Sequence, residues 1–401
     1  MYFYRRAIHP EHYNMGKDIH KSVFDEGTLT KLAILREYIK RWFPVFLKDQ
    51  RYTYRRVQIY DFFAGAGSDI EGNKGSPIII LEELRTYCKT IIERNLKVNL
   101  FFNEFKIEKY HKLNIIVKDF ISGCRKSEYC PLSHTFECPF DFITENKDFK
   151  VLFNELYPEL KKALQIPRFM FLDQNGIKFI DHDIFSKLIS LGRTDFLFFI
   201  SSSFAKRFAE LPEFMEYLKV SKQEFESSKQ YDCHRVILKY YKNLIPTNKV
   251  YYLAPFSIRK QDTGNIYGLV FGSNNLRGLE KFLNTAWSLD KHTGEANFDI
   301  DADRIRTGQY SVFPEGNVVK KLLLFQESLI DFISDQPKSN SEVYQFTLES
   351  GFIPSHANEI LKEFQNSNHL EVQMIKGGEK VRKSSFYLKY KPEKEILIHY
   401  E

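Results

Sequence analysis

The sequence predicts an α/β protein built on a doubly wound, mostly parallel sheet and followed by a C-terminal winged-helix domain. Dense apolar runs of strand length alternate with helical patterns from residue 57 to about residue 273, which is the pattern of parallel strands joined by crossover helices. A glycine-rich turn follows the first of these strands, as in folds that hold a nucleoside at a strand end. Past residue 318 short helices and a basic turn follow, which is typical of a winged helix.

Composition and charge limit the class of protein. The chain has 401 residues, 43% hydrophobic and 27% charged, which fits a globular protein of two or three domains. A net charge of +6 permits nucleic acid as a partner without requiring it. The sequence contains no apolar run of membrane-spanning length and no apolar segment behind the N-terminal arginines, so we expect neither a membrane span nor a secretory leader. Five cysteines without a regular framework favour a reducing cytoplasm, and we expect a cytoplasmic protein.

A helix is expected ahead of the first strand. Apolar residues recur at helical spacing over residues 28–48. The run RVQIYDFF (56–63) then predicts a strand buried on both faces, because consecutive positions are apolar. After the glycine-rich turn, a long helix is expected up to residue 95, with Ser76 as its N-cap and Pro77 as its first residue.

Further strands and helices alternate in the same way. Helical patterns are expected at 107–120 and 147–164. Strands are expected at 98–104, 140–144, 168–173, 195–203, 249–258 and 265–273. The last two strands are predicted as an antiparallel pair, joined by the polar turn RKQDTG. The whole span therefore predicts a Rossmann-like sheet.

The chain divides into three predicted parts. We expect an N-terminal helical lead-in at 1–50, a Rossmann-like domain at 51–315 and a helix plus winged-helix domain at 316–401. Within the second part, an insertion near 121–138 holds three cysteines in a loop-like context. A second insertion near 205–248 is charged and amphipathic, and it is expected to form helix over the active face of the sheet.

The C-terminal part has the element order of a winged helix. An amphipathic helix over 318–334 is followed by the linker-like stretch DQPKSNS (335–341). Two short helices are expected at 342–351 and 354–369, and two strands around a Gly-Gly turn within 370–390. This arrangement is a relative of the helix-turn-helix.

The stretch DFFAGAG (61–67) indicates a ligand that approaches the main chain. Gly65 and Gly67 follow a strand and precede a helix, the context in which absent side chains let a ligand reach the backbone. The alternative is a plain tight turn. Glu104 closes the second strand, where a ribose needs a carboxylate for its hydroxyls. Together the three residues indicate a ligand that carries a nucleoside.

Several motifs carry a family resemblance over roughly residues 25 to 300. The stretch from Tyr60 to Leu84, YDFFAGAGSD…GSPIIILEEL, resembles the first motif of the three-Cys-motif partner protein (TcmP) family, bacterial proteins with a class I methyltransferase-like fold. KLAILREYIKRW (31–42) resembles the family's K…IL…Y…W helix, and TENKDF (144–149) resembles its third-strand acidic motif. IYGLVFGSNNLRGLEKFLNTAW (266–287) resembles its late strand and helix. DFFAGAG is also similar to the S-adenosylmethionine motif of DNA methyltransferases.

The resemblance implies a site for S-adenosylmethionine. Glu104 would take the ribose hydroxyls and Asp148 the adenine amino group, and Phe105 would cover the adenine ring. The methionine portion of the ligand would face Asp61 and the backbone of Ala64, Gly65, Ala66 and Gly67.

Asp173 is the candidate catalytic residue, with Asn175 beside it. Asp173 ends the fourth predicted parallel strand, where open α/β sheets bind substrates. The family has an Asp-Pro-aromatic-Gly segment here, whereas this chain has DQNG (173–176), without proline or an aromatic residue to stack on a flipped base. Methylation of a base amine is therefore not supported by the motif. Asp173, Gln174 and Asn175 would bind a polar acceptor, or Asp173 would only cap its own loop.

Three cysteines raise the question of zinc. Cys124, Cys130 and Cys138 with His134 would complete a tetrahedral site. Their spacings lack the close Cys-x2-Cys pair that marks such sites, so free thiols are favoured and no metal is predicted.

The wing of the C-terminal domain is the predicted nucleic-acid contact. Lys376, Lys380, Arg382 and Lys383 surround the Gly-Gly turn and suit backbone phosphates. The expected recognition helix also carries acidic residues, which argue against deep major-groove contact. Its polar residues are Ser355, His356, Asn358, Glu359, Lys362 and Glu363.

The predicted activity is methyl transfer from S-adenosylmethionine to a nucleic acid or nucleotide. One alternative is a catalytically degenerate methyltransferase fold that binds nucleic acid or a partner protein. Another is a nucleotide-binding enzyme of a different type, such as a dehydrogenase. The resemblance further implies a three-Cys-motif protein as partner and a role in mobile-element or phage-defence biology.

Overall fold

The structure, a computed structural model, describes residues 23–48, 54–126, 130, 138–174, 179–201, 233–260, 266–301, 319–375 and 382–401. Within these ranges no helix has both the length and the apolar character needed to cross a membrane.

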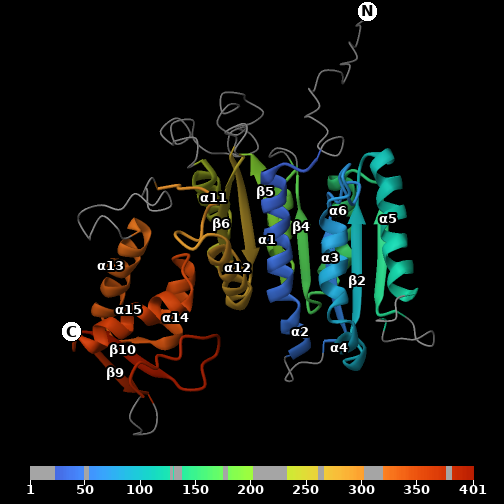
Figure 1. Ribbon diagram of the computed structural model, residues 1–401. Helices are drawn as coiled ribbons and strands as arrows, with labels where there is room; N and C mark the ends of the chain where they lie inside the picture. Colours follow the sequence, from blue (N-terminus) through green and yellow to red (C-terminus); the bar gives the residue numbers. More distant parts are fainter. Residues whose placement is uncertain are drawn as a thin grey trace, which may run out of the picture.

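A seven-stranded sheet forms the centre of the larger part of the molecule (Figure 1). Its spatial order is β3-β2-β1-β4-β5-β7-β6, with β1 to β5 parallel and β7 antiparallel to both of its neighbours. This order confirms the predicted doubly wound, mostly parallel sheet and its final antiparallel pair. The strands are β1 (Arg56–Asp61), β2 (Lys97–Asn103), β3 (Phe140–Glu145), β4 (Arg168–Leu172), β5 (Thr194–Ser201), β6 (Tyr252–Arg259) and β7 (Ile266–Ser273).

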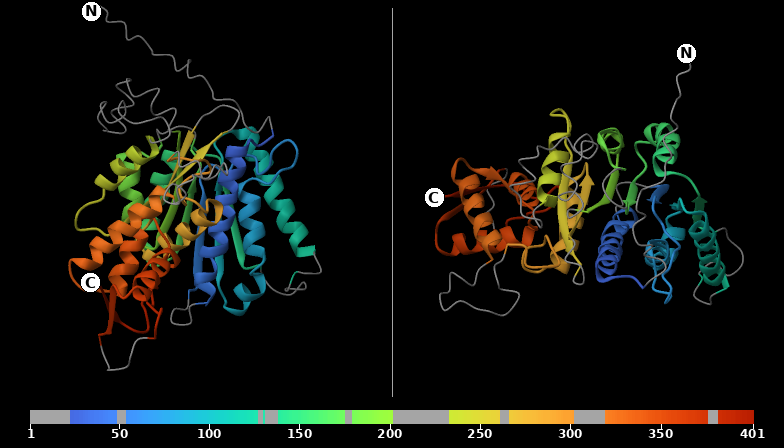
Figure 2. Two further views of the ribbon diagram at one scale, coloured as in Figure 1. Left: turned by 60° about the vertical axis from the view of Figure 1, so that its left-hand side comes forward. Right: turned by 90° about the horizontal axis from the view of Figure 1, so that it is seen from above.

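Helices cover both faces of the sheet, as the view from above in Figure 2 shows. One face carries α1 (Glu26–Trp42), α3 (Ser76–Arg85), α5 (Ile107–Lys126) and α12 (Leu276–Leu289). The other carries α6 (Phe149–Lys162), α7 (His182–Ser190) and α11 (Cys233–Asn243). Successive strand residues point to opposite faces: Phe169 and Phe171 pack under the first layer, and Met170 and Leu172 under the second.

The helix α1 is an integral part of the first layer. It packs between α3 and α12, and Leu35, Tyr38 and Ile39 on its inner side are fully buried. The short helix α2 (Pro44–Lys48) follows it. The predicted lead-in segment therefore contributes residues to the hydrophobic core that covers one face of the sheet.

Two helix predictions need correction near the glycine-rich turn. The long helix expected up to residue 95 breaks after Arg85 and resumes as α4 (Cys88–Glu93), because Tyr87 leaves the helical backbone conformation. The N-cap of α3 is Gly75, and Ser76 is the first helical residue.

The two predicted insertions contain regular structure. Residues 121–126 continue α5, so the first insertion begins as helix. In the second, α11 packs on β6 and β7 with Ile237 and Tyr241 buried. This part belongs to the second helical layer, and does not lie over the active face as expected. Residues 202–232 lie outside the described residues.

The C-terminal domain combines three helices with a small sheet. These are α13 (Lys320–Ser334), α14 (Asn340–Glu349) and α15 (Pro354–Asn366), with the sheet order β8-β10-β9. The strands are β8 (Lys338–Ser339), β9 (Leu370–Met374) and β10 (Ile396–Tyr400). The predicted linker at 335–341 is thus largely β8 and the start of α14, where Ser339 and Glu342 form a capping box.

The second wing strand was placed wrongly by the sequence analysis. It is β10, whereas residues 382–390 form no strand, because Ser384 and Tyr387 have φ of 60° and 50°, which an extended strand cannot accommodate. Phe386 and Leu388 are buried, and they anchor this segment to the core.

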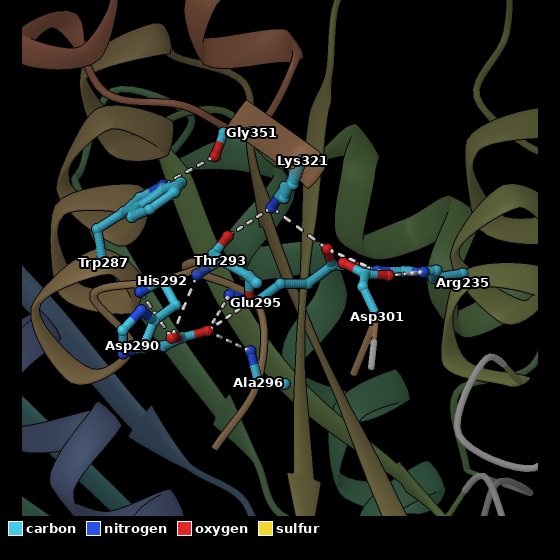
Figure 3. Close-up of polar contacts among 10 residues, drawn as sticks. All are labelled: Arg235, Trp287, Asp290, His292, Thr293, Glu295, Ala296, Asp301, Lys321 and Gly351. Atoms are coloured by element: carbon cyan, nitrogen blue, oxygen red, sulfur yellow. Dashed lines mark hydrogen bonds and ion pairs between the residues drawn. The ribbon is translucent and has the colours of Figure 1, made fainter. Parts of the chain in front are cut away.

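The two parts of the molecule share one hydrophobic core, which includes Phe282 of α12 and Tyr344 of α14. The indole N–H of Trp287 donates to the Gly351 carbonyl at 2.9 Å (Figure 3). The ring of His356 lies 4.1 Å from the Trp287 ring.

An ion network crosses the same contact (Figure 3). Lys321 on α13 donates to the Thr293 carbonyl at 2.6 Å and pairs with Glu295 at 3.2 Å. Glu295 also accepts from Arg235 of α11 at 2.8 and 3.0 Å. Because Glu295 is buried, this contact fixes the winged-helix domain against the end of the sheet.

Candidate functional site

The candidate site lies at the carboxyl ends of β1, β2 and β4. From β1 the chain crosses to β2 on one side, and from β3 it crosses back to β4 on the other side of β1. This reversal is the point at which open α/β sheets bind ligands. Asp61 ends β1, Glu104 follows β2 and Asp173 follows β4.

The glycine-rich turn adopts a conformation that needs glycine. Gly65 and Gly67 have φ of 66° and 85°, in the left-handed region. A Cβ at position 67 would also lie 2.5 Å from Ile116 of α5, and the Gly67 carbonyl accepts from Gly75 N at 2.8 Å. Gly67 is therefore also required by packing.

Glu104 contacts the glycine-rich turn directly. Its Oε2 accepts from the Gly65 N–H at 3.0 Å, and its Oε1 accepts from the Lys106 N–H at 2.8 Å. The carboxylate and the main chain expected to share one ligand are therefore in contact.

Asp61 is fully buried and incompletely paired. Its Oδ1 accepts from the Phe63 N–H at 3.3 Å, and its Oδ2 has no hydrogen-bond partner. Burial raises the pKa of Asp61 to about 7, the charges of Asp173 and Glu104 act in the same direction, and hydrogen bonding by Ser76 and Phe63 acts against them. In its ionised form a buried carboxylate of this kind costs free energy unless a cation or a hydrogen-bond donor lies beside it.

Asp173 forms an ion pair that the sequence analysis missed. Both of its oxygens accept from Lys31 of α1, at 2.6 and 2.7 Å. The ammonium also lies 4.8 Å from the centre of the Phe199 ring. Lys31 opens the K…IL…Y…W motif, and this was the available signal, but a partner 142 residues away cannot be read from the motif.

The residue after Asp173 is structural. Gln174 is buried and donates to the Phe199 carbonyl at 2.9 Å, while its oxygen accepts from Phe179 N at 3.1 Å. Its amide nitrogen and oxygen are thus each engaged within the protein, which disfavours a direct contact of Gln174 with an acceptor. Asn175 lies outside the described residues.

Phe105 and Asp148, the two residues expected around adenine, differ in their surroundings: Phe105 is exposed, and Asp148 caps a helix. Phe105 directly follows Glu104 and is 68% exposed, a high value for a large apolar ring. Asp148 is the N-cap of α6, and its Oδ1 accepts from Lys150 N at 2.9 Å and from Val151 N at 3.2 Å. One oxygen of Asp148 is therefore already engaged.

Two asparagines that the sequence analysis did not select hold the strand ends together. Asn103 is buried and donates to the Phe62 and Lys147 carbonyls at 3.2 and 3.0 Å. Asn146 donates to the Glu104 carbonyl at 2.6 Å. Their position at strand ends was the only signal.

A fourth cysteine lies near the three that the sequence analysis singled out. Burial raises the pKa of Cys88 to about 11, with contributions from Cys138, Cys124 and Cys130. Among the described residues no group of three or more His, Cys, Asp or Glu side chains is placed to hold a metal ion. His134 lies outside those residues.

The expected wing contacts are only partly described. Arg382 and Lys383 are exposed, and Lys376 and Lys380 lie outside the described residues. His356 of the expected recognition helix is turned to the larger domain, where burial and the Lys321 charge lower its pKa to about 4.

Comparisons with known proteins identify the C-terminal domain. A family model described as a GMT-like wHTH domain matches residues 298–377, which confirms the predicted winged helix. Many helix-turn-helix relatives bind nucleic acid. No curated protein matches the chain by sequence.

Two solved structures resemble this chain distantly. One is a candidate methyltransferase, yhhF from Escherichia coli, with a TM-score of 0.25, 14% identity and coverage of 63% of this chain and 90% of that chain. The other is a loganic acid methyltransferase with SAH, with a TM-score of 0.25, 9% identity and coverage of 69% and 88%. At these scores the likeness carries no argument about what this chain binds.

Proposed function

We propose that the carboxyl edge of the sheet binds S-adenosylmethionine and that the chain transfers its methyl group to a nucleic acid or nucleotide. The observation that carries the proposal is the fully buried Asp61, whose Oδ2 has no partner. The methionine portion of S-adenosylmethionine carries an ammonium group, which is a donor and a cation at once. It would satisfy the unpaired oxygen and offset the cost of burying the charge.

The charge of the site favours this ligand over NAD or ATP. Asp61 experiences the negative charges of both Glu104 and Asp173. Lys31 offsets the charge of Asp173. Asp61 and Glu104, however, would repel phosphate groups, whereas the sulfonium and ammonium of S-adenosylmethionine would be attracted. Pro77 near the start of α3 also removes one N–H from the helix end that would otherwise bind a pyrophosphate.

The neighbouring side chains fit the rest of the ligand. Glu104 would accept the ribose hydroxyls, since each of its oxygens has a lone pair beyond the bond it already accepts. The exposed ring of Phe105 would stack on adenine. Asp148 would reach the adenine amino group with the oxygen that does not cap α6. When bound, S-adenosylmethionine supplies an electrophilic methyl group.

Lys31 and Asp173 are proposed to orient the acceptor. They come from α1 and from the end of β4, and their side chains are 12% and 22% exposed. This ion pair is largely shielded from solvent, and it would hold an acceptor group in place by hydrogen bonding. Methyl transfer mainly requires that the acceptor atom be aligned with the methyl group.

The same ion pair supports the second candidate, a fold that binds the ligand without transfer. Both oxygens of Asp173 are taken by Lys31, and Gln174 is a structural residue. A three-Cys-motif partner and a role in phage defence rest on the family resemblance alone, and a cytoplasmic location rests on the cysteine pattern. All three are retained as proposals.

Calorimetric titration of the full chain with S-adenosylmethionine, NAD and ATP tests the proposed ligand. We expect that only S-adenosylmethionine binds among the three ligands. The Asp61→Asn variant should bind it at least tenfold more weakly than the parent does. Glu71→Gln, at an exposed position of the neighbouring loop, is the matched control and should bind as the parent does. Binding of NAD or ATP in preference would contradict the proposal.

Transfer is tested separately with labelled methyl donor and mixed DNA and RNA. Label in nucleic acid that is lost with Asp173→Ala, while donor binding is kept, would support the enzyme. Donor binding without label in any acceptor would favour the degenerate fold.

A further inference from the structure

The amino edge of the sheet, opposite the candidate site, carries a basic cavity. Its volume is about 610 Å³. Four cations line it: Arg55 and Arg56 at the start of β1, Lys97 at the start of β2, and Arg193 ahead of β5. Arg55, Arg56 and Arg193 are exposed.

A second cavity, of about 200 Å³, extends the first toward the C-terminal domain. The two have Tyr54, Pro167 and Arg193 in common, so they form one continuous groove. In this second part Arg277 and Lys281 come from α12, and Tyr390 and Lys391 come from the winged-helix domain. We call this surface the amino-edge groove, and its cations are Arg55, Arg56, Lys97, Arg193, Arg277, Lys281 and Lys391.

The charge of the amino-edge groove is one-sided. Among the described residues that line it, Asp195 is the sole acid. Asp195 is 7% exposed, and its Oδ2 accepts from the Tyr38 hydroxyl at 2.7 Å. Its charge is therefore directed into the core, and seven cations face the groove. Cations gathered along an extended surface are the footprint of a polyanion site.

Aromatic rings lie among these cations. The Arg193 guanidinium lies 5.6 Å from the centre of the Tyr54 ring. At the other end, Arg277 and Lys391 lie 5.9 and 5.6 Å from the centre of the Tyr390 ring. Rings and guanidinium planes between phosphate-binding cations are what unpaired bases stack on, whereas the acidic side chains of a peptide carry no aromatic ring to stack there.

We propose that the amino-edge groove binds a single strand of nucleic acid. The cations bind the phosphates, and Tyr54 and Tyr390 with their guanidinium neighbours stack against bases. The groove differs from the wing around Arg382 and Lys383, and it lies on the sheet edge away from the carboxylates at 61, 104 and 173. Its binding does not depend on the methyl donor.

Fluorescence anisotropy of the full chain with a labelled 20-nucleotide oligo(dT), over a range of KCl concentrations, tests the proposal. We expect Arg55→Gln/Arg56→Gln to weaken binding about tenfold at low salt and to reduce the salt slope by about one to two. Lys112→Gln/Lys118→Gln, two exposed cations of α5, is the matched control and should leave both quantities unchanged. Equal affinity and slope in the two double variants would overturn the proposal.

Further variants and ligands distinguish the groove from the wing and from a surface that attracts any polyanion. Tyr390→Leu should weaken binding with an unchanged salt slope, because stacking is not electrostatic. Arg382→Gln/Lys383→Gln should keep most of the affinity; if it alone abolishes binding, the wing is the site and the groove is not.

Binding of polyglutamate but not of oligo(dT), or equal binding of a duplex of the same length, would likewise overturn the assignment. Donor binding, measured calorimetrically on the Arg55→Gln/Arg56→Gln variant, should match the parent.

Discussion

At the scale of single residues, the molecule concentrates unpaired negative charge at one place. Asp61 has no solvent exposure and an oxygen without a partner, a condition that costs free energy in the ligand-free protein. The other buried acids in the described part of the chain have partners: Asp290, for example, accepts from the main chain of His292 at 3.0 Å and of Ala296 at 3.3 Å. This contrast is an argument for the proposal that a bound ligand supplies the missing partner of Asp61.

Asp61→Asn should stabilise the ligand-free protein in a pH-dependent way. The pKa of Asp61 rises from 3.8 to about 7 on folding, so the cost of its ionisation is absent below pH 4, grows up to pH 7 and stays constant above. We expect the variant to gain on the order of 2–4 kcal/mol in free energy of unfolding at pH 8 and nothing at pH 4. Urea unfolding at the two pH values measures this.

The control for this experiment is Asp119→Asn, which removes an exposed carboxylate of α5. It should change the free energy of unfolding little at either pH. An Asp61→Asn protein less stable than the parent at pH 8 would mean that the carboxylate has a partner in solution.

At the scale of elements, α1 connects the site with the sheet. Three residues of its K…IL…Y…W motif have separate tasks. Lys31 pairs with Asp173 at the carboxyl edge, Tyr38 donates to Asp195 near the amino edge, and Trp42 packs against Phe169 with ring centres 5.7 Å apart. One helix thus braces both edges of the sheet.

Tyr38→Phe tests this bracing. Loss of the hydroxyl leaves the buried Asp195 with one hydrogen bond fewer, and we expect a loss of about 1–3 kcal/mol in free energy of unfolding. Burial raises the pKa of Asp195 to about 6, and the Tyr38 hydrogen bond is among the effects that lower it. The cost should therefore be larger at pH 8, where Asp195 is ionised, than at pH 5. Urea unfolding measures both values.

Tyr87→Phe is the matched control, because the Tyr87 hydroxyl makes a long, exposed contact of 3.5 Å with Lys40 O. It should cost less than about 0.5 kcal/mol. A cost of Tyr38→Phe that is equal at pH 5 and pH 8 would show that Asp195 does not depend on this hydroxyl.

The sequence predicts elements better than it predicts their contacts. The strand runs around Tyr60, Phe102 and Phe171 are apolar at consecutive positions, and all three lie in strands. The turn at Gly65 and the acid at Glu104 were also identified, because strand ends carry local signals. The Lys31–Asp173 pair could not be found, since it joins positions 142 residues apart.

Other misses have local causes. The break of α3 at Tyr87 follows no glycine or proline, so no sequence signal marks it. The segment at 384–390 has a strand-like composition, but left-handed residues such as Tyr387 interrupt it. The cluster of cations in the amino-edge groove could not be predicted from the sequence either, because only the fold brings Arg56, Arg193 and Lys391 together.

At the scale of the whole molecule, the two edges of the sheet have opposite character. Three carboxylates lie at the carboxyl ends of the strands, and the basic groove lies at the amino ends, roughly 20 Å away for a six-residue strand such as β1. The C-terminal domain contributes Tyr390 and Lys391 to the basic edge. The docking of this domain against α12 therefore determines the shape of the groove.

Acid should loosen this docking through His356. Burial and the Lys321 charge lower the pKa of His356 to about 4, from an unfolded value of 6.5. A group with a lowered pKa contributes stability above pH 6.5, and this contribution is lost as the pH falls toward 4, because the undocked state takes up the proton. Thermal unfolding followed by tryptophan fluorescence should show this loss of stability, because the Trp287 ring lies beside the His356 ring.

The variant His356→Gln carries no titrating ring, so its melting temperature should fall less than that of the parent between pH 7 and pH 5. His369→Gln, at an exposed position after α15, should retain the parent's pH dependence. Because Lys391 lies on the same domain as His356, the acid-induced loosening should also weaken oligo(dT) binding in the parent more than in His356→Gln. Identical pH profiles for His356→Gln and the parent would show that the domain contact does not depend on a neutral imidazole.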